Sequence, residues 1–515
     1  MNFFSKGKSG DSHASSNASD PLDEVIYTFN NGKDCLTLRD LVTGSLTQGS
    51  SSSGKSSGFN HGLLQSLFKA NYGGVALSVK QSFSRYFLKT AEKMRRKVIH
   101  FHSGSDLTFN PLEYEIIRQG GGQIEINNLT NLIILLCVLV GNYKAGGAGG
   151  KGGDDRFWLS ASEKLINRAI LLLLLAKLPV TFYNIRKIVA STFHEQEADR
   201  YHEIWSVLLD ENVSPEKKSE TYDGYQNWMN SNFFLSVFHT ANSREDLNSE
   251  DYFQMELCGE YFLKTYPRLA PKTKSIVEES VSGLFENFNY GIMKSHFSEG
   301  VSEELLPENT YQKGDIILID FSIKQFGLSG ILANALYKYI WQTAMERRQT
   351  ETEEAPKPAF LFADEFHNLI NPNYDQLFQA TARESLAITV YITQSLPSII
   401  GAFGTENPEN RAKSMIANLG LKVFCANSDY DTNEFASQMI GQHFIDVSSI
   451  SIDKDKNANR SYSQQLQWKV PPEHFFLLKT GGPKNKYTVE SILVKAGKQW
   501  SNGENYLPAE FNQLD

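Results

Sequence analysis

The chain has few cysteines and no excess of positive charge, and each deficit excludes a class of protein. Its 515 residues include four cysteines, Cys35, Cys137, Cys258 and Cys425. Their wide spacing matches neither a disulfide framework nor a zinc site, and it fits a reducing compartment. The formal net charge of -9 excludes nucleic-acid binding through bulk positive charge, so any such contact must be local.

Long hydrophobic runs are also missing. The two most apolar stretches, LIILLCVLV at 132–140 and ILLLLLA at 170–176, fall short of the roughly 18 residues that a membrane-spanning helix needs. Both are predicted to be buried helices, and no transmembrane segment is expected. Residues 1–22 have no apolar signal-peptide core and are predicted to form a disordered polar tail. A cytoplasmic protein is therefore expected.

What is present is an alternation of strand and helix patterns, which is typical of an α/β fold with a mostly parallel, helix-covered sheet. This alternation occupies residues 23–112 and returns over 310–500. Between them, residues 113–309 are almost entirely helical in pattern. The sequence therefore predicts one α/β domain, split by a mostly helical region, with a C-terminal tail at 501–515.

The segment GSSSSGKS at 49–56 matches the phosphate-loop pattern G-x-x-x-x-G-K-[ST]. In such loops backbone N–H groups surround the phosphates, the lysine reaches the β- and γ-phosphates and the hydroxyl holds Mg²⁺. The alternative is a serine-rich flexible linker. A strand pattern before the loop and an amphipathic helix after it favour the P-loop and ATP binding. The predicted ATP-binding residues are Gly49, Ser53, Gly54, Lys55, Ser56 and Ser57.

A second segment, AFLFADEF at 359–366, is an apolar strand that ends in two acids. We expect Asp364 to hold Mg²⁺ together with Ser56, and Glu365 to act as the catalytic base for the attacking water. Alone, the pair could equally be a capped turn between a strand and a helix. The P-loop at 49–56 makes the catalytic interpretation the stronger one.

Two further residues are candidates for the same reaction. Gln394 ends the predicted strand AITVYIT, where its side chain could contact the γ-phosphate or the water. Arg383 precedes that strand, and in ring ATPases an arginine there can reach the nucleotide of a neighbouring subunit. The alternative for Arg383 is a solvated arginine at a helix end. Lys80 and Asp320 also lie at strand ends, where ligands gather in open α/β sheets, but neither receives a role.

These motifs, in this order, resemble the type IV coupling proteins, the TraD/TraG-like conjugative DNA-transfer ATPases of the HerA–FtsK superfamily. The resemblance also includes DLTFNPLEY (106–114), RFWLSASEKLINRAILLL (156–173), RLAPKTKSIVEESVSGLFENF (268–288) and NLGLKVFCANSDYDTNEFASQMIG (418–441). It extends over residues 24–500. Three features differ. Typical members begin with transmembrane helices, and none can be read here. The family's loop usually has threonine and glycine where this chain has serines, and the acidic-lysine-glycine signature after VALSV is SVKQS here.

The resemblance implies a RecA-like P-loop ATPase domain with an inserted all-α domain that recognises substrate. It gives Glu365, Arg383 and Gln394 the roles of catalytic glutamate, arginine finger and sensor glutamine. It also implies ATP and Mg²⁺ as ligands, and a homohexamer with DNA in its central channel. Further implied partners are a relaxase or another secreted substrate, and a membrane-anchored protein that would hold the motor at the inner membrane.

Three functions remain open from the sequence. The first is an ATP-driven motor that delivers DNA or a protein–DNA conjugate to a secretion channel. The second is a soluble HerA-like translocase in phage defence or DNA processing. The third is a nucleotide-binding adaptor without motor activity, which the acidic pair Asp364–Glu365 disfavours because such an adaptor does not need the glutamate.

Overall fold

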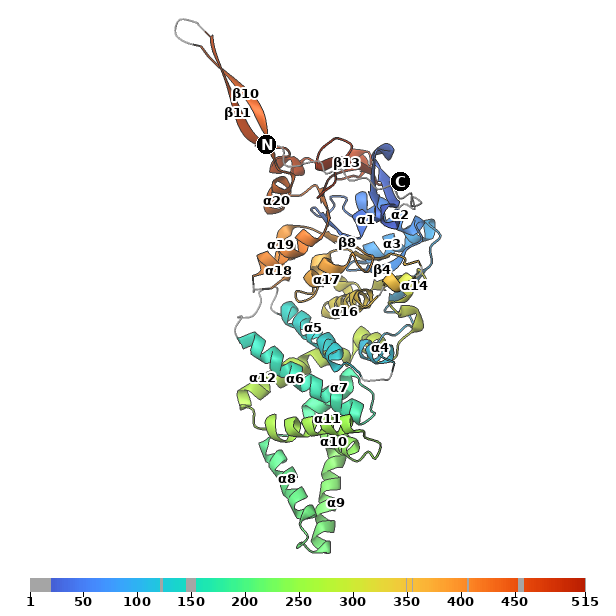
Figure 1. Ribbon diagram of the computed structural model, residues 1–515, viewed down its shortest axis with the longest axis vertical. Coiled ribbons are helices and arrows are strands. Elements are labelled where there is room, and N and C mark those ends of the chain that lie inside the picture. The colour runs from blue at the N-terminus through green and yellow to red at the C-terminus, as the bar shows by residue number, and fades with distance from the viewer. Residues whose placement is uncertain are drawn as a thin grey trace, which may run out of the picture.

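The computed structural model describes residues 20–120, 124–144, 154–348, 350–353, 355–404, 407–452 and 458–514. Figure 1 shows an elongated molecule with a sheet in the middle, helices at one end and a two-stranded hairpin projecting at the other. Most of the predicted polar tail, residues 1–19, lies outside the described residues. Its last residues, Pro21–Asp23, form a short 3₁₀ helix.

The central element of the fold is one large sheet. Its strands are β3 (Ser45–Gln48), β4 (Gly73–Leu77), β5 (Val98–His102), β6 (Ile316–Asp320), β7 (Ala359–Ala363), β8 (Ala387–Thr393), β9 (Leu421–Cys425), β12 (Thr488–Lys495) and β13 (Tyr506–Asn512). Among the described residues they lie in the order β13-β12-β9-β3-β8-β7-β4-β6-β5. From β9 to β5 the strands are parallel, whereas β12 and β13 are antiparallel at one edge. The predicted mostly parallel α/β sheet is confirmed.

Helices cover both faces of this sheet, which explains why central strands such as β7 and β8 are apolar and buried along their whole length. On β7, Phe360 and Phe362 pack into a core shared with α2 and α3, while Leu361 and Ala363 pack into a second core on the opposite face. The first face carries α1 (Leu38–Leu41), α2 (Phe59–Lys69) and α3 (Gln81–Lys93), and the second carries α16 (Leu328–Glu346), α17 (Asp375–Thr381), α18 (Leu396–Ala402) and α19 (Pro408–Asn418). Parallel strands covered in this way bring all their carboxyl ends to one edge.

The helical region lies between β5 and β6 in the chain. Its helices are α4 (Pro111–Arg118), α5 (Ile126–Lys144), α6 (Asp154–Leu175), α7 (Phe182–Ser191), α8 (Glu195–Leu209), α9 (Pro215–Ser231), α10 (Phe233–Asn242), α11 (Ser249–Gly259), α12 (Pro271–Phe285) and α13 (Gly291–Phe297). Helices α8 and α9 form its far end (Figure 1). The apolar runs at 132–140 and 170–176 lie in α5 and α6 and are largely buried. Among the described residues no helix is long and apolar enough to cross a membrane.

The structure departs from the sequence prediction at the C-terminus. Residues 501–515 were expected to be a tail, but Tyr506–Asn512 form the edge strand β13, paired with β12. The alternation explains the difference, because Leu507, Ala509 and Phe511 are buried and the residues between them are exposed. A second departure is the hairpin of β10 (Gln442–Ile452) and β11 (Ala458–Trp468), whose eleven-residue strands project from the body (Figure 1).

A smaller difference concerns the N-terminal hairpin, for which the alternating patterns EVIYTF at 24–29 and CLTLRDL at 35–41 predict two strands. Strands β1 (Val25–Phe29) and β2 (Asp34–Thr37) pair, but the second strand stops at Thr37. There the Thr37 hydroxyl accepts from the Asp40 N–H and the Asp40 carboxylate accepts from the Thr37 N–H, which forms a capping box. Residues 38–41 are therefore helix α1 rather than strand.

Candidate nucleotide site

The predicted P-loop joins β3 to α2 at the carboxyl edge of the sheet. The N–H of Gly49 donates to the carbonyl of Gln394 at 3.1 Å, and the N–H of Ser50 donates to the carbonyl of Ala426 at 2.9 Å. On the far side of the loop, the amide of Asn60 on α2 donates to the carbonyl of Lys55 at 2.9 Å. The loop is thus held at both ends by the strands and helix around it.

Between these anchors, three consecutive backbone N–H groups of the loop have no hydrogen-bond partner among the described residues. The N–H groups of Gly54, Lys55 and Ser56 donate to no group in the described part of the chain. The hydroxyl of Ser53 is also buried without a hydrogen-bond partner among those residues. Buried donors without partners are costly, and phosphate oxygens would satisfy them. The loop therefore fits a phosphate group.

Gly54 is required by this loop for two reasons. Its φ is +82°, in the region that favours glycine. A Cβ at this position would also lie 2.5 Å from a methyl carbon of Val489, the second residue of β12. The late strand β12 thus packs directly against the loop.

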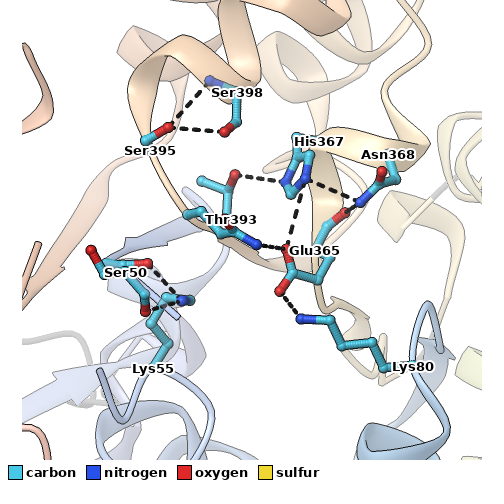
Figure 2. A network of polar contacts seen from close by, with 11 residues as sticks. Ser50, Lys55, Lys80, Glu365, His367, Asn368, Thr393, Ser395 and Ser398 are labelled. Carbon is cyan, nitrogen blue, oxygen red and sulfur yellow. Dashed lines mark hydrogen bonds and ion pairs between the residues drawn. The ribbon is translucent and has the colours of Figure 1, made fainter. Parts of the chain in front are cut away.

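Lys55 lies in this loop with its ammonium group largely enclosed. Its Nζ donates to the carbonyls of Gly49 at 2.6 Å and Ser50 at 2.7 Å, as drawn in Figure 2. Burial lowers the pKa of Lys55, although the nearby Glu365, Cys425 and Asp364 counteract this effect. The two carbonyl oxygens are neutral hydrogen-bond acceptors. A negatively charged phosphate would bind the ammonium group of Lys55 more strongly.

The acidic pair follows β7 and faces the P-loop. Ser53, Gly54, Lys55, Ser56, Ser57, Asp364 and Glu365 line one cavity of about 280 Å³, together with Ser51, Ser52, Lys80, Ser82, Phe83 and Tyr86. The structure thus brings together residues separated by some three hundred positions in the chain. A larger cleft of about 1740 Å³ is lined by residues of the helical region and of the loop that leads into it, between Thr108 and Gly300, but the smaller cavity contains the phosphate loop and the paired acids.

Glu365 is held by several groups at once (Figure 2). Its Oε1 is ion-paired with Lys80, and its Oε2 accepts from the side-chain amide of Gln394 at 3.0 Å. His367 Nε2 lies 3.7 Å from the same Oε2. Burial would raise the pKa of Glu365, but the hydrogen bond and charge of Lys80 outweigh burial and lower it. The carboxylate is therefore stabilised in its ionised form.

The backbone of Glu365 is also unusual. Its φ of 50° and ψ of 44° place it in the left-handed region, which costs a residue with a side chain about 1–2 kcal/mol. The turn is supported by the Asn368 N–H and side-chain amide, which both donate to the Glu365 carbonyl. Strained residues of this kind concentrate at functional sites.

His367 takes part in this support. Its Nδ1 lies 3.0 Å from the Thr393 hydroxyl and its Nε2 lies 3.1 Å from the Asn368 amide nitrogen. Burial lowers the pKa of His367, which favours a neutral ring. The ring positions the turn that carries Glu365.

Asp364 differs from its neighbour because it is nearly fully buried. Burial, followed by the negative charge of Glu365, raises the pKa of Asp364 to about 6. A nearby divalent cation would relieve both causes. Mg²⁺ uses one or two protein oxygens plus phosphates and water, so Asp364 and the Ser56 hydroxyl, in one cavity, fit it. Among the described residues no cluster of three metal ligands is present.

Arg383 is the one predicted site residue that lies away from the cavity within a single chain. It is exposed in the turn between α17 and β8, whereas Gln394 follows the other end of β8. Seven residues of strand separate these two ends, a distance of roughly 23 Å at 3.3 Å per residue. Arg383 therefore does not reach the nucleotide cavity of its own chain.

Sequence reasoning left two contacts of the site unassigned. Lys80 was noticed only as a charged residue at a strand end, and the structure pairs it with Glu365. Gln513 lay in the expected tail, yet its side-chain amide donates to the Ser57 hydroxyl at 2.5 Å. The strand-end rule could have pointed to Lys80, whereas nothing local indicated Gln513.

Comparison with known proteins agrees with this geometry. Residues 358–472 match the family described as the TraM recognition site of TraD and TraG. No curated protein sequence matches the chain significantly. Among solved structures, the bacterial conjugative coupling protein TrwBdeltaN70 in its unbound form aligns with a TM-score of 0.60 at 12% identity, over 96% of this chain and 92% of that chain.

The plasmid coupling protein TrwB was also solved with a non-hydrolysable ATP analogue. That structure aligns with a TM-score of 0.58 at 13% identity, over 96% of this chain and 92% of that chain. The complex with the GTP analogue GDPNP aligns with a TM-score of 0.57 at 12% identity, over 95% and 91%. The fold is therefore that of these coupling proteins, and the resemblance noted from the sequence is confirmed.

Proposed function

We propose that the chain is an ATP-hydrolysing DNA-translocating motor, a coupling protein that delivers DNA or a protein–DNA substrate to a type IV secretion channel. The observation that carries the proposal is the single cavity shared by Lys55 of the P-loop and the acids Asp364 and Glu365. A phosphate cradle opposite a positioned carboxylate is the arrangement that nucleotide hydrolysis requires. The fold shared with the coupling proteins supports the transport role.

Each residue has a distinct part in the reaction. The free N–H groups of Gly54, Lys55 and Ser56 and the ammonium group of Lys55 bind the phosphates. Ser56 and Asp364 hold Mg²⁺, which when bound neutralises charge on the phosphates. Glu365, kept ionised, accepts a proton from the attacking water.

Gln394 connects the two sides of the site. Its side-chain amide donates to Glu365 while its carbonyl accepts from the N–H of Gly49 at the start of the P-loop. If the P-loop moves when nucleotide binds, Gln394 would therefore transmit that movement directly to the carboxylate of Glu365. This position fits the sensor role expected for Gln394.

The proposed assembly is a homohexamer with a central DNA channel. Arg383 supports it, because an exposed arginine at the opposite edge of the sheet can stabilise transition-state charge only in a neighbouring subunit. With a net charge of -9, DNA contact must be confined to local surfaces such as a channel lining. A relaxase or another secreted protein bound by the helical region, and a membrane-anchored protein at the inner membrane, complete the proposed partners.

ATP turnover with and without DNA tests the proposal. We expect wild-type turnover to rise with DNA, and Glu365→Gln to lower turnover about 100-fold or more while ATP still binds. Lys413→Met, which breaks only the exposed ion pair with Glu409, serves as the control. Unchanged turnover in Glu365→Gln would refute the role of the base. Nucleotide binding without turnover in the wild type would favour the adaptor function.

A further inference from the structure

Lys80 is a second lysine in the nucleotide cavity, and the reaction described above gives it no part. It follows β4 and is the N-cap residue of α3, so it enters the cavity from a different side than the P-loop. Its side chain is 31% exposed, whereas Lys55 is buried in the loop. Lys80 therefore has room to change partners.

In the structure, Lys80 is bound to the predicted base. Its ammonium group pairs with Oε1 of Glu365, while Gln394 occupies Oε2 (Figure 2). A carboxylate held by an ammonium group is a weaker base, because protonation would break that ion pair. Glu365 must leave Lys80 before it can accept a proton from water efficiently.

The cavity provides the competitor that would separate them. A nucleoside triphosphate in the P-loop carries its terminal phosphate on the side of Glu365, because the base must align water with that phosphate. The terminal phosphate carries more negative charge than one carboxylate does, and it also offers several acceptor oxygens to Lys80. Lys80 lies close enough to the phosphate-binding groups to influence the charged states of both Lys55 and Asp364.

We propose that Lys80 is a γ-phosphate sensor that pairs with Glu365 when the terminal phosphate is absent and binds that phosphate when ATP is present. The exchange frees Glu365 only when there is a bond to hydrolyse. With ADP, the ion pair between Lys80 and Glu365 persists and the base stays blocked. This inference rests on the proposed function, because it assumes that the cavity binds ATP.

Affinity for a non-hydrolysable ATP analogue, compared with affinity for ADP, tests the exchange. Lys80→Met should lower the affinity for the analogue by about 10- to 100-fold, the usual effect of losing a charge-assisted hydrogen bond. The affinity for ADP should change less than about threefold. Lys80→Arg keeps the charge and should retain most of the discrimination. Lys89→Met, at an exposed position of the same helix α3, should bind both ligands as the wild type does.

A second measurement tests the coupling between the two residues. Glu365→Gln removes the ion pair and should tighten binding of the analogue, because Lys80 no longer has to leave a partner. In the Lys80→Met background the same substitution should have no effect on the analogue. Far-UV circular dichroism of each variant establishes that it is folded.

The outcomes separate this inference from the proposed function. Equal loss of analogue and ADP binding in Lys80→Met, or no loss of either, would overturn the sensor role while leaving ATP hydrolysis by the wild type intact. A wild-type protein that binds neither ligand would instead overturn the proposed function itself.

Discussion

A fully buried ion pair lies directly behind the acidic turn and allows a quantitative prediction. Lys338 of α16 pairs with Asp375, the first residue of α17, and both side chains are 0% exposed. The ammonium group of Lys338 also lies 5.1 Å from the ring centroid of Phe366, the residue after Glu365. We predict that Lys338→Met lowers the free energy of unfolding by about 3–5 kcal/mol.

The magnitude follows from the partners that Asp375 keeps. The side-chain amide of Gln342 donates to it at 3.0 Å and the N–H of Asn371 at 2.8 Å. Two neutral donors do not compensate a buried negative charge after the lysine is removed. Adding Asp375→Asn removes the charge and keeps an acceptor for Asn371. A 180° turn of the Gln342 amide would let its Oε1, which has no partner among the described residues, accept from the new amide. The double variant should regain at least about 2 kcal/mol.

Urea unfolding followed by far-UV circular dichroism and tryptophan fluorescence measures these differences. Lys413→Met is the matched control, because its ion pair with Glu409 is exposed and is worth at most about 0.5 kcal/mol. The reasoning would be refuted if Lys338→Met were as stable as the control. It would also be refuted if the double variant were no more stable than the single one.

Three further predictions concern the loop, the edge strand and the subunit contact. Gly54→Ala should abolish ATP binding, measured by fluorescence titration, because the added Cβ meets Val489; the helical Gly224→Ala, whose Cβ meets nothing within 4 Å, should bind normally. Deletion of residues 506–515 should cost about 3–6 kcal/mol in urea unfolding from two lost apolar side chains; a neutral result would mean that β13 is dispensable. Arg383→Ala should stop turnover but not binding, and mixing it with an excess of Lys55→Met subunits should restore activity if the arginine acts between subunits.

The parts of the fold that the sequence predicted are those with local signals. The P-loop follows from glycine and lysine spacing between a strand and a helix, and the sites of Asp364 and Glu365 follow from an apolar run that ends in two acids. Strands buried on both faces are continuous apolar runs, so β7 and β8 coincide with the apolar runs AFLFA and AITVYIT. Local chemistry was sufficient at each of these positions.

What the sequence did not predict depends on pairing between distant segments. The sequence of β13 is a short alternating pattern. Its pairing with β12 is seen in the structure but is not specified by that pattern. Gln513 reaches Ser57 because it directly follows β13, whose last residue Asn512 pairs with Thr488 at the start of β12, a register that no local pattern specifies. Lys80 could be identified as a strand-end residue, but its partner Glu365 lies 285 positions later.

The strand order explains why motifs so far apart meet. In the sheet, β8 lies between β3, which leads into the P-loop, and β7, which ends at the acids. The residue after β8, Gln394, must therefore lie between the phosphate cradle and the base, and β4 on the other side of β7 must bring Lys80 to the opposite flank of Glu365. The carboxylate is thus placed between a neutral amide and a cation. Phosphate binding can therefore affect Glu365 from both sides, through Gln394 and through Lys80. A base that acts only when ATP is bound requires such a connection.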